Sequence, residues 1–178
     1  MNKEAASQDT VSHEGNNHGA EATNEDLYFE DFTVGRKFPA GSHTVTEEEM
    51  LEFSRHFDPQ PMHVDKDAAE KGAYGGLIAS GWHTAALAIK LAAEAKPFGN
   101  TQMLGLGVSD LRWPQPVRPG DTLTVELEVE DARVSKSNPD FGIVKFRVSA
   151  HNQRGELAYE KHPSCWVPRR KPGRETSS

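Results

Sequence analysis

The sequence predicts an α+β domain in which an antiparallel sheet wraps around one long central helix. Two patterns support this prediction. The segment from Gly81 to about Ala95 is rich in Ala and Leu and is apolar on nearly every side, which is typical of a buried helix. The second half of the chain alternates apolar and polar residues, which is typical of strands with one buried face. A sheet curled around the helix is the most economical way to bury both.

The length and composition of the chain predict one folded domain between two tails. With 178 residues, the chain can bury a sizeable core. We expect the domain to occupy residues 26–168. Residues 1–25 are polar and contain no aromatic side chain, which predicts a disordered tail. Residues 169–178 are basic and are interrupted by Pro and Gly, which predicts a second, flexible tail.

Charge and cysteine content narrow the classes of function. The chain carries 27 acidic and 20 basic side chains, and its net charge of −7 disfavours binding to nucleic acid or to an anionic membrane. Cys165 is the only cysteine, so no intrachain disulfide can form and a reducing compartment is favoured. The N-terminus lacks the features of a signal peptide, and no apolar stretch is long enough to span a bilayer. We therefore expect a cytoplasmic protein.

The first helix expected along the chain starts after Thr46 and ends by Phe57. Thr46 and Glu49 have the spacing of a capping box, in which each side chain bonds the other residue's backbone N–H. Asp58 cannot continue the helix, because it precedes Pro59. Asp58 therefore lies at a position that the packing of this helix fixes.

The other elements follow from capping residues and alternation. A short helix is expected over about 67–71, with Asp65 as its N-cap and Gly72 at its end. The alternating segments "TLTVELEVE" and "IVKFRVSA" predict strands at 122–130 and 143–150. Flanking strands are expected at 36–45, 103–113 and 157–167. Such a sheet leaves edge strands to be covered, which favours a homodimer.

The stretch "FDPQPMHVD" (57–65) places a carboxyl group and an imidazole five residues apart, at Asp58 and His63. Two prolines stiffen the chain between them, and we expect no helix here. A carboxylate and a histidine suit general acid–base catalysis near neutral pH. Taken alone, the same residues also fit a helix stop and a packed histidine.

Two segments of the chain resemble one known family. "FDPQPMHVD" resembles the D-x-N-P-x-H signature of the MaoC-like, (R)-specific enoyl-CoA hydratases and dehydratases, and "GGLIASGWHTAAL" (75–87) resembles the segment that leads into their central helix. "YFEDFTVGRKF" and "LRWPQPVRPGDTL" are similar to the family's first and return strands. The resemblance covers roughly residues 28–168 and implies the hot-dog fold. Gln60 stands where the signature has Asn, and Phe57 stands where many members have Gly.

The resemblance implies a hydro-lyase that hydrates 2-enoyl-CoA to (R)-3-hydroxyacyl-CoA or catalyses the reverse dehydration. Asp58 and His63 would be the acid–base pair. The amide of Gly81, at the start of the central helix, would stabilise charge on the thioester oxygen, and glycine would let that oxygen approach closely. The expected substrate-binding residues are Ser80, Trp82, His83 and Arg112. We expect an acyl-CoA or acyl-carrier thioester as substrate, with no metal and no cofactor beyond the coenzyme A of the substrate.

Some of these residues have a second interpretation. Ser80 also fits the N-cap of the helix, and Arg112 fits a surface cation as well as a contact to a coenzyme A phosphate. His63, Asp65 and His83 do not have a recognised metal-ligand spacing. Two alternative functions follow: a thioesterase that directs water at the carbonyl carbon, and a non-catalytic acyl-CoA-binding subunit.

Overall fold

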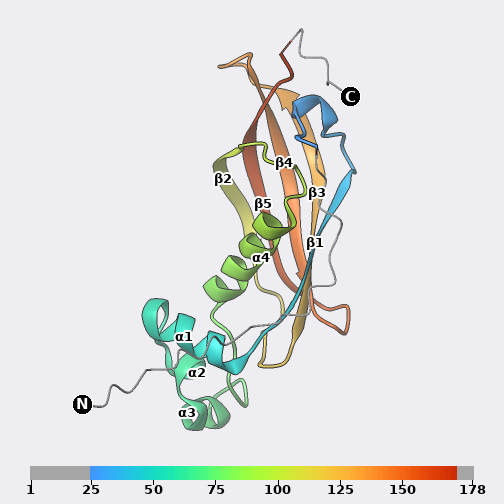
Figure 1. Cartoon of the computed structure of the whole chain (residues 1–178). Helices are drawn as coiled ribbons and strands as arrows, with labels where there is room; N and C mark the ends of the chain where they lie inside the picture. Colours follow the sequence, from blue (N-terminus) through green and yellow to red (C-terminus); the bar gives the residue numbers. More distant parts are fainter. Residues whose placement is uncertain (1–24, 172–178) are drawn as a thin grey trace, which may run out of the picture.

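A sheet of five antiparallel strands carries one long helix, α4 (Gly81–Ala95), in the computed structural model, which describes residues 25–171 (Figure 1). The strands are β1 (Lys37–Thr44), β2 (Leu104–Arg112), β3 (Thr122–Val134), β4 (Phe141–His151) and β5 (Leu157–Pro168). They lie in the order β1-β3-β4-β5-β2 across the sheet. The predicted α+β fold and its five strands are confirmed. The tail expected at the N-terminus, up to residue 24, and most of the C-terminal tail lie outside the described residues.

Alternation along the central strands places one face of the sheet in the core. Leu123, Val125 and Val129 of β3 are each 1% exposed, and they alternate with Thr and Glu side chains on the other face. Phe146 of β4 contacts Phe98, which follows α4, with ring centroids 5.5 Å apart. The buried face of the sheet is therefore the face that packs against the helix.

Helix α4 is less buried than its composition predicts. It packs mainly on β1, and Thr84 and Leu87 face the core. On its other side α4 presents an apolar stripe to solvent, which consists of Trp82, Ala86, Ile89 and Ala93. The expectation of a helix buried on nearly every side is therefore wrong for the single chain, because nothing within residues 25–171 covers this stripe. No helix in the described part of the chain is long and apolar enough to cross a membrane.

Three short helices gather near the N-terminal end of α4 (Figure 1): α1 (Glu47–Phe57), α2 (Pro61–Val64) and α3 (Lys66–Lys71). The predicted capping box of α1 is present, since Glu49 N–H donates to Thr46 Oγ1 over 3.2 Å and Thr46 N–H donates to Glu49 Oε1 over 2.7 Å. Asp65 caps α3 as predicted, accepting a hydrogen bond from Ala68 N–H.

The one-turn helix α2 corrects the expectation that residues 57–65 hold no helix. Pro61 is the first residue of α2. At that position the missing N–H removes no intrahelical bond, and the fixed φ of proline already suits a helix. The prolines therefore stop one helix at Asp58 and start another, which carries His63.

The first two residues of the expected C-terminal tail, which starts at residue 169, contact the other end of the described chain. Arg169 Nε donates to Glu30 Oε1 over 3.2 Å. Arg170 Nη2 donates to Asp31 Oδ2 over 2.7 Å. Glu30 and Asp31 belong to the short 3₁₀ helix η1 (Phe29–Asp31), so these two ion pairs join the ends of the described chain.

Candidate active site

The carboxylate of Asp58 lies at the end of α1. Asp58 is the C-cap residue of that helix, and its backbone N–H donates to the carbonyl oxygen of Ser54 over 2.9 Å. Met50 and Ser54 anchor α1 in the domain, since both are fully buried. The packing of the helix therefore sets the position of the Asp58 side chain.

Two hydrogen bonds hold this carboxylate. Ser80 Oγ donates to Asp58 Oδ2 over 2.6 Å, and Gln60 Nε2 donates to Asp58 Oδ1 over 2.7 Å. These bonds, Ser80 first, and the nearby His63 hold the pKa of Asp58 below its ordinary value, against the opposing effect of burial. Asp58 is therefore a carboxylate at neutral pH.

His63 faces the same carboxylate from α2. Its ring is nearly buried, at 5% exposure, and its Nδ1 lies 2.9 Å from the carbonyl oxygen of Ile78. A carbonyl oxygen only accepts, so Nδ1 carries a proton, and Nε2 is the ring nitrogen that faces Asp58. Nε2 lies 3.5 Å from Asp58 Oδ2. The site thus places a carboxylate and an imidazole nitrogen side by side.

The amide of Gly81 follows Ser80, the residue that bonds Asp58, and is free to bind. Gly81 is the first residue of α4, and its N–H has no acceptor within residues 25–171. Thr84 N–H donates to Ser80 O over 3.1 Å, which fixes the peptide plane that carries this amide. The Ser80 hydroxyl also accepts from Trp82 N–H over 3.2 Å, so Ser80 is the N-cap of α4 and the partner of Asp58 at once.

Trp113 gives a different reason for glycine at position 81. Its indole Nε1 donates to the carbonyl oxygen of Gly81 over 2.8 Å. A Cβ atom added to Gly81 would lie 2.8 Å from Cε2 of the same indole ring. The sequence predicts that glycine admits a ligand oxygen here; the structure shows that the space beside its Cα holds Trp113.

The three other residues expected to bind substrate lie in different surroundings. Trp82 is 59% exposed and meets Trp113 edge to face, with ring centroids 5.4 Å apart. His83 is buried and stacked on Phe53, and burial lowers its pKa, so its imidazole is neutral. Its Nδ1 has no hydrogen-bond partner in the described chain.

Arg112 lies on the face of the sheet that points away from α4. It is opposite Glu160 in the β2–β5 ladder, and Glu160 lies on the solvent face of the sheet, where Arg147 is 3.9 Å away. The guanidinium of Arg112 is exposed and lies 3.7 Å from Asp110. The structure therefore does not bring Arg112 together with Asp58 and His63.

Gln60 and Trp113 were missed as members of the site. Gln60 was visible only as a departure from the family signature, two residues after Asp58. The contact of Trp113 with Gly81 joins residues 32 positions apart, and no local pattern signals it. Within residues 25–171, no three His, Cys, Asp or Glu side chains are grouped in a way that would hold a metal ion.

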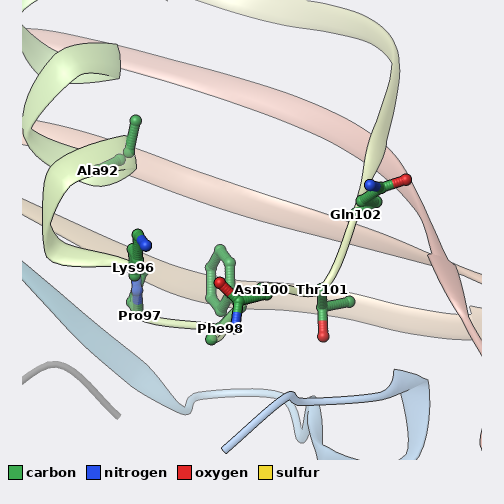
Figure 2. Close-up of a pocket in the computed structure, with 9 residues that line it drawn as sticks. Ala92, Lys96, Pro97, Phe98, Asn100, Thr101 and Gln102 are labelled. Carbon is green, nitrogen blue, oxygen red and sulfur yellow. The ribbon is translucent and has the colours of Figure 1, made fainter. Parts of the chain in front are cut away.

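A separate pocket of about 450 Å³ opens at the opposite end of α4 (Figure 2). Lys96, Phe98 and Asn100 are among the residues that line it. The 15 residues of α4 place its two ends roughly 20 Å apart. This pocket includes neither Asp58 nor His63 and does not belong to the acid–base site.

Comparisons with known proteins found a matching family and similar structures. Residues 31–151 match the family described as MaoC like domain. The uncharacterized protein YdeM of Bacillus subtilis is 33% identical over 143 residues, which are 80% of this chain and all of that protein. The crystal structure of a MaoC-like dehydratase from Rhodospirillum rubrum superposes with a TM-score of 0.75 at 40% identity, covering 82% of this chain and 99% of that chain. The R-hydratase PhaJ1 from Pseudomonas aeruginosa gives 0.66 at 26% identity, covering 82% and 88%.

Proposed function

The chain belongs to the MaoC-like dehydratase family, and on this premise we propose that it hydrates a 2-enoyl-CoA to the (R)-3-hydroxyacyl-CoA, or dehydrates that product in reverse. The observation that carries the proposal is the approach of His63 Nε2 to Asp58 Oδ2, 3.5 Å apart. Two R-hydratases, from Pseudomonas aeruginosa and A. caviae, share the fold at 26% identity each, which supports the assignment of reaction class.

The pair is suited to hold and activate one water molecule. A water that donates one proton to Asp58 and the other to His63 Nε2 has its lone pair free for the β carbon of the substrate. The pKa of Asp58 is lowered, so its carboxylate is a weak base, and we assign the proton transfer to His63 Nε2. The resulting imidazolium is stabilised by the adjacent carboxylate. It then returns this proton to the α carbon, so that one water is added overall.

The Gly81 amide would stabilise the charge that develops on the substrate during the reaction. Negative charge builds on the thioester oxygen as the β carbon is attacked, and an unpaired N–H at the start of α4 is placed to bind it. Losing one such donor typically costs about 10²–10³ in rate. Asp58, His63 and the Gly81 amide are together sufficient for the proposed hydration of a coenzyme A thioester.

A homodimer is part of the proposal. Strand β2 is an edge strand on which Leu104, Leu106 and Val108 are 61%, 46% and 56% exposed. The other edge, β1, is interrupted by Pro39 and carries the charged Lys37, features that block edge pairing. Trp113, which follows β2, contacts Trp82, so the β2 edge continues into the apolar stripe of α4. A second copy would cover both.

An ultraviolet assay of the conjugated enoyl-thioester band tests the function. With crotonyl-CoA and a longer homologue, we expect the band to disappear and (R)-3-hydroxyacyl-CoA to form. Free thiol appearing while the band persists would identify a thioesterase instead. Binding of either thioester without conversion would identify a non-catalytic acyl-CoA-binding protein.

A further inference from the structure

Lys161 of β5 points to the face of the sheet that packs against α4. It is opposite Val148 of β4, and residues opposite each other in an antiparallel ladder share a face. Val148 is 4% exposed and belongs to the core. Along β5, Tyr159 and Val167 lie on the same face at even spacing, and both are buried. An ammonium group on this face is unexpected, because the neighbouring positions are apolar or aromatic.

This lysine has no anionic partner within residues 25–171. Other lysines of the sheet do pair: Lys37 lies 2.8 Å from Glu126, and Lys145 lies 3.5 Å from Glu130. Glu160, next to Lys161 in the chain, is on the opposite face, near Arg147. Lys161 is only partly exposed, and burial lowers its pKa. Buried charges are normally paired, but no carboxylate of residues 25–171 pairs with this ammonium group.

The position of Lys161 relates it to the acid–base site. Tyr159 precedes it on the same face, and two residues of a strand span about 7 Å. The Tyr159 ring lies 6.4 Å from Trp113, which in turn bonds Gly81. Lys161 therefore follows, on the same face of β5, the tyrosine that contacts Trp113 beside the proposed thioester-binding amide. Strand β5 lies next to the exposed edge strand β2.

We propose that Lys161 binds a carboxylate on the acyl group of the substrate, so that the preferred substrates are coenzyme A thioesters of acids with a second carboxyl group. This inference rests on the proposed function of the Asp58 and His63 site. A single ammonium group between Tyr159 and Cys165 matches a single carboxylate in charge. A phosphate of coenzyme A carries more charge and is usually held by several donors, which this face does not offer.

Saturated thioesters test this proposal without any reaction, because they have no double bond to hydrate. Calorimetric titration would compare succinyl-CoA with butyryl-CoA, and adipyl-CoA with hexanoyl-CoA. We expect the wild type to bind the carboxylated member of at least one pair roughly tenfold more tightly or better. Lys161→Met should abolish this preference and leave the affinity for butyryl-CoA and hexanoyl-CoA unchanged. Lys145→Met, on the opposite face, should keep the preference.

Three results would overturn the proposal: equal affinity within both pairs, a preference that survives Lys161→Met, or dissociation of a dimer caused by Lys161→Met. The last would show that the carboxylate comes from a second copy of the chain. The variant should fold, because methionine is apolar and close in length; we expect its melting temperature to equal or exceed that of the wild type. A carboxylate preference in a protein that hydrates no enoyl-CoA would support the role of Lys161 in binding a carboxylate and would refute the proposed function.

Discussion

At the residue scale, the Ser80 hydroxyl joins the Asp58 carboxylate to the start of α4. It donates to Asp58 over 2.6 Å and accepts from Trp82 N–H over 3.2 Å, so one group serves both the charge of the site and the cap of the helix. The lowered pKa of Asp58 has the Ser80 bond as its largest cause. The stability that this carboxylate provides is present above the unfolded pKa of Asp and is lost as the pH falls through the lower folded value.

Ser80→Ala should raise the pKa of Asp58, so that the part of the acid limb of kcat/KM caused by protonation of Asp58 begins at higher pH. The same change removes the N-cap, at a cost of about 1 kcal/mol in the free energy of unfolding. Thr46→Ala is the matched control, since it removes the N-cap of α1 at a similar cost without touching Asp58. The pH–rate profiles of both variants distinguish an effect on Asp58 from an effect on helix capping. An unmoved acid limb in Ser80→Ala would show that the hydroxyl only caps the helix.

The contact between Trp113 and Gly81 leads to a second prediction. Gly81→Ala should lower the melting temperature and the activity, because the new Cβ would lie 2.8 Å from the indole ring. Adding Trp113→Leu should recover part of both losses, since the double variant removes the clash. Thermal melts and rates for the two single variants and the double variant form a cycle. Purely additive losses would mean that position 81 is glycine for a different reason.

At the element scale, α4 links the candidate site to the exposed apolar surface formed by its own stripe and the β2 edge. Its first residue, Gly81, offers the free amide, and its exposed stripe adjoins the β2 edge through Trp82 and Trp113. Because one helix bears both features, the proposed dimer would form beside the site.

A charge placed on the β2 edge should therefore separate the dimer. Val108→Lys puts an ammonium group at a 56% exposed position of β2 and should shift the protein to monomer in analytical ultracentrifugation. Val34→Lys is the control, because Val34 is 67% exposed and lies outside β2 and α4. Wild-type protein that sediments as a monomer at micromolar concentration would refute the dimer.

At the scale of the whole molecule, the sequence predicted the elements better than the contacts between them. Period-two alternation located the strands, and the capping pairs located the helices, because both signals are local. The exposed stripe of α4 was missed, since composition alone does not show which face a neighbour covers. The one-turn helix at Pro61 differs from the prediction, because proline stops a helix that precedes it but also suits the first residue of a new one.

Only the part of the site that lies in one short motif was predictable from the sequence. Asp58 and His63 lie five residues apart in one motif, so their proximity was foreseeable. The hydrogen bond from Trp113 to Gly81 and the unpaired ammonium of Lys161 depend on strand register, which no single segment determines. Such contacts between distant segments became visible only in the folded chain.

The measurement that tests the central claim most directly is a cycle of hydration rates on crotonyl-CoA for Asp58→Asn, His63→Ala and the double variant. If the two residues activate one water together, each single variant should lose about 10² or more in kcat, and the double variant should be little worse than either. Circular dichroism would confirm that all three remain folded. Losses that multiply in the double variant, or a wild-type rate that survives either change, would contradict the shared acid–base role.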